Sequence, residues 1–162
     1  MKKIFLLEDS LIVAELLKFE LENEFNCKVI CFNDGNSLLS QIELKPDLII
    51  LDYFIDNTQY ENGLDIMNRV KAINDKLPLI VFSGQHNIKL AIQLIHAGAV
   101  DYIDKNEDSF LEDINNAVRN VFHFNEAKKQ LNQAQEKISL DRKQLLAFGL
   151  LGLGLLISLL VV

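Results

Sequence analysis

The sequence predicts an α/β protein in which a parallel sheet is covered by helices on both faces. Short apolar runs alternate along the chain with stretches whose apolar residues have helical spacing. Two of these runs, LIIL and LIVF, are apolar at every position, which is typical of strands buried on both faces of a parallel sheet. The predicted strands cover residues 4–7, 29–32, 48–51, 79–82 and 102–103.

The helices between these strands have recognisable start signals. Ser10 precedes the first helix, the letters NDGN precede the second, and Asn62 with Gly63 precedes the third. In the first helix, Leu11 and the apolar residues that follow at three- and four-residue intervals predict one buried face. Neither proline nor glycine occurs in residues 110–144, so we expect one long helix there, about 50 Å in length.

That helix is too long for one small domain, and we expect a compact domain over residues 1–122 followed by a helical stalk over residues 123–144. The stalk has apolar residues at alternating three- and four-residue steps, which is typical of a coiled-coil seam. They are Phe124, Ala127, Leu131, Ala134, Ile138 and Leu145, with Asp141 as the interruption. A solvated spacer helix is the alternative interpretation.

Residues 145–162 form an uncharged run, LLAFGLLGLGLLISLLVV, which predicts a transmembrane tail anchor. As a helix it would be about 27 Å long. A buried core helix is the alternative, but a domain of this size could not surround a helix that is apolar on every side. Arg142 and Lys143 precede the run, which favours a domain on the cytoplasmic face of a membrane, in our expectation the bacterial inner membrane.

Charge and cysteine content exclude some functions. The net charge is −7 and no basic cluster occurs, so nucleic acid is not an expected partner. The only cysteines, Cys27 and Cys31, lie in the strand-like CKVICF without companion ligands. They are best interpreted as packing residues in a reducing compartment, with a zinc site as the alternative.

Side chains that could bind a metal ion or take part in catalysis follow four of the predicted strands. Because parallel strands open their carboxyl ends on one edge of the sheet, these side chains should meet there. They are Glu8, Asp9, Asp52, Ser83 and Lys105. Neighbouring carboxylates need a cation, and Mg²⁺ prefers such oxygen ligands, so Asp52 is predicted as a nucleophile toward a phosphoryl group beside a bound Mg²⁺. The alternative is that acids occur at strand ends only because strands end in water.

Five segments carry a family resemblance in order and approximate spacing: LLEDS, PDLIILD, NGLDIMNRVK, LIVFSG and AGAVDYIDK. Residues 2–121 resemble the receiver domain of two-component response regulators, the CheY-like superfamily. The resemblance implies a five-stranded parallel sheet of order 2-1-3-4-5 flanked by helices. It also implies that the domain accepts phosphate from a histidine kinase or a phosphotransfer protein, as a phosphoacceptor rather than a turnover enzyme.

Carried over to this sequence, the resemblance assigns roles at the sheet edge. Asp52 is implied as the phosphoacceptor, with Ser83 and Lys105 as the hydroxyl and the lysine that contact the phosphoryl group. Tyr102 is implied as the aromatic switch that turns inward with Ser83. The implied metal ligands are Glu8, Asp9, Asp52 and the backbone carbonyl of Phe54.

Two departures from the family pattern bear on this site. The segment YFIDNTQYEN after Asp52 is longer than the usual loop and lacks its proline, so the rim of the metal site should differ. Asn106 stands where the family has a proline after the lysine, and a cis bond there would cost about 2.5–4 kcal/mol, so we expect Lys105 to be held less firmly. Phe54 should restrict the access of water to Asp52.

Together these expectations describe a membrane-tethered, single-domain response regulator that signals to a downstream protein partner, with a homodimer as one pairing that the stalk would allow. Two other functions remain open. A pseudo-receiver would work as a phosphorylation-independent, membrane-anchored interaction module. A flavodoxin-like electron carrier shares the sheet order, but Glu8 and Asp9 would repel the phosphate of its flavin.

Overall fold

The computed structural model describes residues 1–55, 62–85 and 87–160, with side chains as far as Leu146. The chain divides into two compact units, Met1–Val121 and Phe122–Val162. The first unit holds the whole sheet, and the second is the continuation of the last helix.

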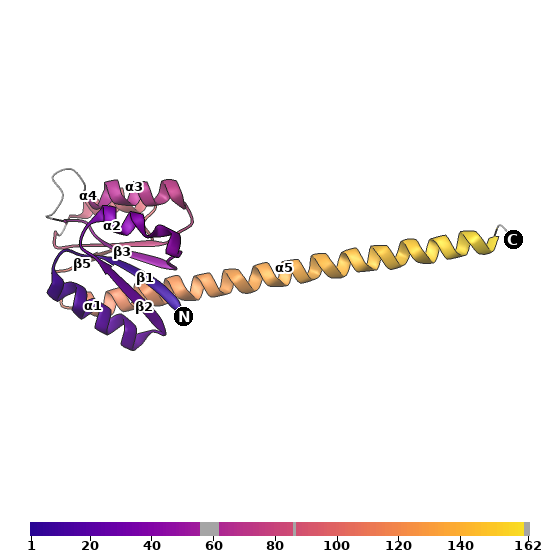
Figure 1. Cartoon of the computed structure of the whole chain (residues 1–162), viewed down its shortest axis with the longest axis horizontal. Coiled ribbons are helices and arrows are strands. Elements are labelled where there is room, and N and C mark those ends of the chain that lie inside the picture. Colours follow the sequence, from indigo (N-terminus) through magenta and orange to yellow (C-terminus); the bar gives the residue numbers. More distant parts are fainter. Residues whose placement is uncertain (56–61, 86, 161–162) are drawn as a thin grey trace. The chain divides into compact units, whose positions relative to one another are not determined.

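The first unit is built on a five-stranded parallel sheet (Figure 1). Its strands are β1 (Lys2–Leu7), β2 (Cys27–Phe32), β3 (Leu48–Asp52), β4 (Leu79–Ser83) and β5 (Asp101–Asp104). The order is β2-β1-β3-β4-β5 and every neighbouring pair is parallel, which confirms the predicted sheet. All residues of β3 and β4 are buried, as their continuous apolar runs predicted.

All five strands are longer than predicted, and β1, a central strand, begins two residues earlier than predicted, at Lys2. β2 begins at Cys27 and β5 spans four residues, because the ladder includes positions that face solvent. Lys28 is exposed on β2 yet pairs with Lys3 of β1, so a search for apolar runs alone misses it.

Helices cover both faces of the sheet (Figure 1). They are α1 (Leu11–Glu24), α2 (Gly35–Ser40) with the 3₁₀ turn η1 (Ile42–Leu44), α3 (Gly63–Ile73), α4 (Ile88–His96) and α5 (Phe110–Leu160). α2, α3 and α4 contribute Leu38, Met67 and Leu94 to one hydrophobic core. α1 and the beginning of α5 cover the other face, where α1 buries Ala14, Leu17 and Leu21.

Two predictions about α1 need correction. Leu11, which was placed on the buried face, is 74% exposed, because it lies at the first turn beyond the edge of the sheet. Ser10 occupies the N-cap position, but its side chain makes no capping hydrogen bond. Its backbone N–H donates instead to Glu8 Oε1 at 2.9 Å, so this turn helps to orient a site carboxylate.

The start of α3 is built as predicted. The Asn62 side chain accepts from the Asp65 N–H, and the Asp65 side chain accepts from the Asn62 N–H, which is a capping box. Gly63 follows, and its N–H donates to Tyr53 O at 2.9 Å. A Cβ at Gly63 would lie 2.7 Å from the Tyr53 Cα, so only glycine allows this helix to begin so close to the end of β3.

α5 begins at Phe110, as predicted, and is helical to Leu160. The side chains of residues 147–162, on which the predicted tail anchor depends, lie outside those that the structure describes. Within the described part of the chain, no helix has the length and apolar character required to cross a membrane.

Candidate functional site

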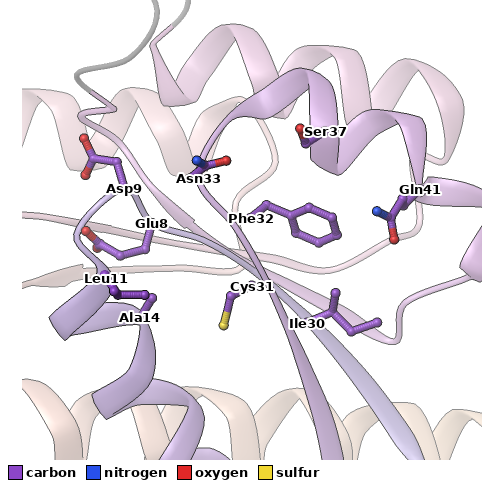
Figure 2. Close-up of a pocket in the computed structure, with 10 residues that line it drawn as sticks. All are labelled: Glu8, Asp9, Leu11, Ala14, Ile30, Cys31, Phe32, Asn33, Ser37 and Gln41. Carbon is purple, nitrogen blue, oxygen red and sulfur yellow. The ribbon is translucent and has the colours of Figure 1, made fainter.

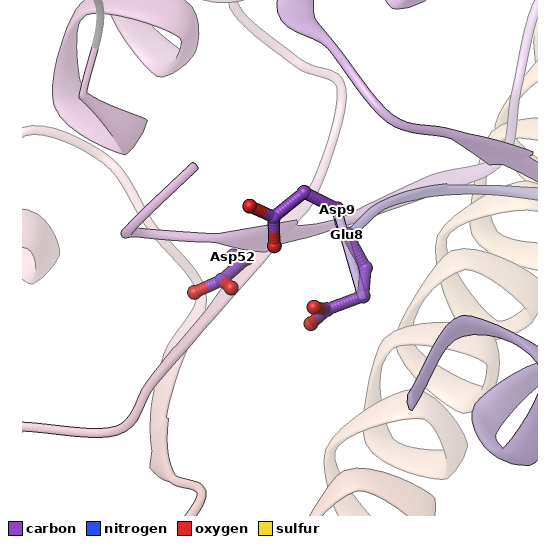
Figure 3. A group of neighbouring side chains, drawn as sticks. All are labelled: Glu8, Asp9 and Asp52. Carbon is purple, nitrogen blue, oxygen red and sulfur yellow. The ribbon is translucent and has the colours of Figure 1, made fainter. Parts of the chain in front are cut away.

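Three carboxylates meet at the carboxyl edge of the sheet (Figure 3). Glu8 and Asp9 directly follow β1, and Asp52 is the last residue of β3. β1 and β3 are neighbours with Leu7 paired to Leu51, which places the next residues side by side. One carboxylate oxygen from each acid lies within 4.8 Å of the others, and we call Glu8, Asp9 and Asp52 the acid cluster.

Lys105 places a cation in this site. Its Nζ donates to Glu8 Oε2 at 2.7 Å and to Asp52 Oδ2 at 2.6 Å, and it lies 4.4 Å from the centre of the Phe82 ring. The Lys105 backbone N–H donates to Ser83 O at 2.8 Å, which fixes the residue after the end of β5. Sequence reasoning placed Lys105 at this edge but missed its bond to Glu8, because neither local pattern nor spacing reports a contact across 97 residues.

Burial dominates the electrostatics of the acid cluster. Desolvation raises the pKa of Asp52 above its ordinary value, while the hydrogen bond and the charge of Lys105 act in the opposite direction. The pKa of Glu8 is raised for the same reason, with Lys105 and the Ser10 N–H opposing the rise. Glu8 and Asp52 share the single ammonium group of Lys105, so a divalent cation beside these two carboxylates would add the positive charge that offsets their mutual repulsion.

The donor set of the acid cluster fits Mg²⁺. Carboxylate oxygens are the hard ligands that this ion prefers, and Mg²⁺ usually takes only a few of them and keeps water on its remaining positions. Glu8 is 4% exposed and Asp52 is 3% exposed, which is rare for carboxylates without a functional reason. The arrangement can therefore hold a divalent cation next to a buried carboxylate.

Ser83 and Tyr102 form a second group at the same edge, connected by Gln85. The Ser83 side chain is fully buried, and its Oγ accepts from the Gln85 N–H at 3.2 Å. The Tyr102 hydroxyl donates to Gln85 O at 2.5 Å. The pKa of Tyr102 is raised by burial, and a hydrogen bond with the Ser83 hydroxyl opposes part of this rise. Sequence reasoning missed Gln85, which contributes through its backbone and therefore leaves no side-chain signal.

Residues 4–119 match the response regulator receiver domain family, which is well over half of the chain. The chain belongs to this family. The acid cluster is accordingly typical of the Mg²⁺ site of a receiver domain, and receiver domains pair with histidine kinases.

Relatives of known name agree with this assignment. The chain is 32% identical over 112 residues to the protein-glutamate methylesterase/protein-glutamine glutaminase of Clostridium acetobutylicum, covering 67% of this chain and 32% of that protein. It is 27% identical over 155 residues to the response regulator protein TmoT of Ectopseudomonas mendocina, covering 92% of this chain and 69% of that protein. The chain thus spans about a third of the first relative and about two thirds of the second.

Solved structures show the same fold. The signal receiver domain of a putative Luxo repressor protein from Vibrio parahaemolyticus superimposes with a TM-score of 0.71 at 23% identity, covering 80% of this chain and 96% of that one. NtrX from Brucella abortus superimposes with a TM-score of 0.66 at 25% identity, covering 78% of this chain and 29% of that one.

This receiver domain departs from the family pattern after Lys105. The side-chain amide of Asn106 donates to Gly84 O at 2.5 Å, and its backbone N–H donates to Asp104 Oδ1 at 2.9 Å. No peptide bond in the described residues is cis. The expectation that Lys105 would be held less firmly finds no support in these contacts, because Asn106 ties the end of β5 to the β4 side of the site and Lys105 keeps two carboxylate partners.

Phe54 lies two residues beyond Asp52 of the acid cluster. Its N–H donates to Asp52 Oδ1 at 3.1 Å and its ring packs edge-on against that of Tyr53. The side chain is 42% exposed. The role of its carbonyl as a metal ligand stays a prediction, and most of the long loop that follows, residues 56–61, lies outside the described residues.

A cavity of about 600 Å³ adjoins the acid cluster on the β2 side (Figure 2). Glu8 and Asp9 border one end, and Ser37 of α2 and Gln41, the residue after α2, border the other. Cys31 also lines it, whereas Cys27 is buried, with its pKa raised to about 11 by desolvation. A thiol with so high a pKa is neutral and inert, which agrees with the prediction of a packing role for Cys27.

Proposed function

We propose that this receiver domain accepts a phosphoryl group on Asp52, in a Mg²⁺-dependent reaction, from the phosphohistidine of a histidine kinase or phosphotransfer protein. The observation that carries the proposal is the position of Asp52. Its carboxylate is 3% exposed, lies in the acid cluster, and accepts from Lys105 Nζ at 2.6 Å and from the Phe54 N–H at 3.1 Å.

The reaction is a displacement at phosphorus. A carboxylate oxygen of Asp52 forms a bond to phosphorus while the phosphorus–nitrogen bond of the donor breaks, and the electron pair of that bond returns to the imidazole nitrogen. The product is an acyl phosphate on Asp52 and an imidazole on the donor. Asp52 must be ionised to attack, and Lys105 favours the ionised form against the desolvation that opposes it.

The neighbouring residues stabilise the charge of the transferring group. A Mg²⁺ held by Glu8, Asp9 and Asp52 would supply electrostatic neutralisation of the phosphoryl oxygens. Lys105 is hydrogen-bonded to Asp52 and is therefore within reach of a group bonded to it. The Ser83 hydroxyl lies at the end of β4, next to β3 in the sheet, and is proposed to donate to a phosphoryl oxygen.

The signal is proposed to pass through Ser83 and Tyr102. Both contact the same residue, Gln85, through its N–H and its carbonyl respectively. Movement of the Ser83 hydroxyl toward a phosphoryl group would break its bond to the Gln85 N–H and so shift the loop that holds the Tyr102 hydroxyl. This gives two arrangements of the edge formed by α4, β5 and α5, between which phosphorylation selects for a downstream protein partner.

We also propose that the chain is tethered to the cytoplasmic face of a membrane. The support is the 18-residue uncharged run at residues 145–162, which as a helix approaches the thickness of a hydrocarbon layer, and the cations Arg142 and Lys143 before it.

Phosphorylation of the full chain in a mild detergent tests the phosphotransfer. The chain is incubated with acetyl phosphate and its intact mass is measured with Mg²⁺ and with EDTA, in the natural protein and in Asp52→Ala. We expect a phosphoryl adduct with Mg²⁺ that disappears with EDTA and in the variant. Asp9→Ala should form much less adduct even with Mg²⁺, because it removes one proposed ligand of the ion, while Glu43→Ala, which removes an exposed acid of η1, should behave as the natural protein.

A folded protein without any adduct would contradict the phosphotransfer and favour the second candidate, a pseudo-receiver that binds partners without phosphate. One observation favours that candidate: the bond from Asn106 to Gly84 O joins the β4 and β5 ends of the site independently of any phosphoryl group.

A further inference from the structure

The second unit of the chain carries a line of exposed apolar side chains on α5. Phe124, Leu131, Ile138 and Leu145 are spaced by seven residues, and their side chains are 67, 59, 59 and 72% exposed. Residues seven apart lie above one another on a helix that is slightly underwound, as in coiled coils. We call these four residues the stalk seam. A solvated spacer helix has no physical need for a large apolar residue in every second turn.

The residues three positions after Phe124, Leu131 and Ile138 complete a coiled-coil pattern. With Phe124 at heptad position a, the d positions are Ala127, Ala134 and Asp141. The two alanines leave space opposite them for large apolar side chains of a second helix. Asp141 instead needs a polar or cationic side chain opposite it, because an unpaired charge in a helix interface is costly.

The positions that flank the seam carry charge of one sign. The e and g positions of a coiled coil border the apolar line and select the partner through ion pairs. In the stalk they are Lys128, Gln130, Gln135, Lys137, Arg142 and Gln144. Three are cations and none is a carboxylate, whereas Glu126 and Glu136 fall at positions c and f, away from the seam. The stalk seam is therefore bordered by positive charge.

A second copy of the chain is a poor match for this surface. In a parallel pair, Lys137 at position g would face Arg142 of the other copy at position e, and Asp141 would face itself across the interface. In an antiparallel pair, position e faces position e, so Lys128 and Arg142 would again meet cations. Like charges at these positions oppose association, which is how coiled coils reject the wrong partner.

We infer that the stalk seam binds an amphipathic helix of another protein. That helix would have large apolar residues at its own a and d positions, a polar or cationic residue at the one core position opposite Asp141, and glutamate or aspartate at e and g. Such a helix would fill the space beside Ala127 and Ala134, and its acids would pair with Lys128, Lys137 and Arg142. The inference rests on the helix alone and goes beyond the proposed function, because it requires neither phosphorylation nor Mg²⁺.

Binding of designed peptides to the full, unphosphorylated chain in a non-ionic detergent tests the inference. The probe is a fluorescent four-heptad peptide with glutamate at e and g and with leucine at a and d, except for one asparagine at the core position that would face Asp141. The control peptide differs only in having lysine at e and g. Fluorescence anisotropy should show at least tenfold tighter binding of the acidic peptide, and the difference should shrink at high salt. Because no phosphoryl donor is present, failure of the proposed phosphotransfer would not affect this result.

Matched variants locate the binding face. Lys137→Glu with Arg142→Glu should abolish the preference for the acidic peptide, whereas Lys129→Glu with Lys143→Glu changes the charge equally at position f and should preserve it. Likewise, Ile138→Asp should abolish binding, whereas Leu140→Asp, at an equally exposed position c, should not. Circular dichroism should show the same helix content in all four variants.

Three results would overturn the inference. The first is equal affinity for the acidic and the basic peptide. The second is a homodimer, detected by sedimentation equilibrium, that Ile138→Asp dissociates, which would assign the seam to a second copy. The third is an affinity for phosphatidylglycerol vesicles that both pairs of charge reversals reduce alike while neither peptide binds, which would assign the cations to lipid headgroups.

Discussion

At the scale of single residues, the site is controlled by how deeply its carboxylates are buried. Desolvation raises the pKa of Asp52 above its ordinary value of 3.8 and that of Glu8 above 4.5. The folded, metal-free protein therefore binds protons more tightly at these two groups than the unfolded chain does. Their contribution to the free energy of unfolding falls as the pH rises from the ordinary carboxyl range through the raised pKa values.

Asp52→Asn should remove the contribution of Asp52 to this pH dependence. In EDTA, the variant should be more stable than the natural protein by an amount that grows between pH 4 and pH 7, on the order of 1 kcal/mol, which is a typical effect of one substitution. Urea unfolding across that pH range checks the prediction. Mg²⁺ should then stabilise the natural protein more than the variant. A variant that is less stable than the natural protein at pH 7 in EDTA would show that the bond to Lys105 outweighs desolvation.

Phe54 provides a second prediction at this scale. Its half-exposed ring lies two residues from Asp52 and should hinder water that attacks the acyl phosphate. Phe54→Asn should therefore increase the rate of dephosphorylation several-fold, measured by the decay of the phosphorylated mass after the donor is removed. Phe19→Asn replaces an exposed phenylalanine on α1 and should leave the rate unchanged. An unchanged dephosphorylation rate in Phe54→Asn would contradict the hypothesis that this side chain shields Asp52.

At the scale of elements, the close approach of α3 to the end of β3 sets the geometry behind Asp52. Gly63→Ala would place a Cβ 2.7 Å from the Tyr53 Cα, a backbone atom that cannot rotate away. We expect a loss of about 1–3 kcal/mol in the free energy of unfolding, as for other overpacked sites. Gly84→Ala is the control, since a Cβ there meets nothing within 4 Å. Thermal or urea unfolding of both variants measures the loss in the free energy of unfolding, and equal losses in the two variants would contradict the packing argument.

The elements also show why sequence reasoning succeeded for some features and failed for others. The capping box of Asn62 and Asp65 is a local pattern, and the predicted helix start was correct. Serine is a common helix N-cap, but the Ser10 side chain makes no capping hydrogen bond, and its backbone N–H binds the Glu8 carboxylate instead. The residue type at this position was therefore misleading. Leu11 was misplaced because amphipathic spacing does not report where a helix extends beyond the sheet.

The acid cluster was predictable because parallel strands bring their ends together, which needs only the strand positions and the direction of the chain. The network around it was not predictable in the same way. Lys105 bonding to Glu8, and Gln85 linking Ser83 to Tyr102, depend on side-chain and loop geometry across the sheet. Such contacts join residues distant in sequence, and their backbone partners leave no trace in residue type.

At the scale of the whole molecule, the division into two units separates the residues of the proposed phosphotransfer from those of the proposed tether. The acid cluster, Lys105, Ser83 and Tyr102 all belong to Met1–Val121. The stalk seam belongs to Phe122–Val162. Both units contribute residues to the single helix α5. A change at the sheet edge thus has a continuous helical element through which to reach the stalk, which is the physical basis for expecting the two functions to be coupled.

The proposed tether gives the last prediction. The full chain should float with phosphatidylcholine vesicles in a density gradient, because transfer of the uncharged run into hydrocarbon is favourable, whereas a fragment of residues 1–144 should remain at the bottom. Replacing Leu153 and Leu156 together by arginine should also prevent flotation, since each central arginine costs about 2.5–3.5 kcal/mol on insertion scales. Neutral lipid is used so that the stalk cations alone cannot produce binding. A full chain that stays with the fragment would contradict the tether while leaving the chemistry of Asp52 intact, because the two belong to different units.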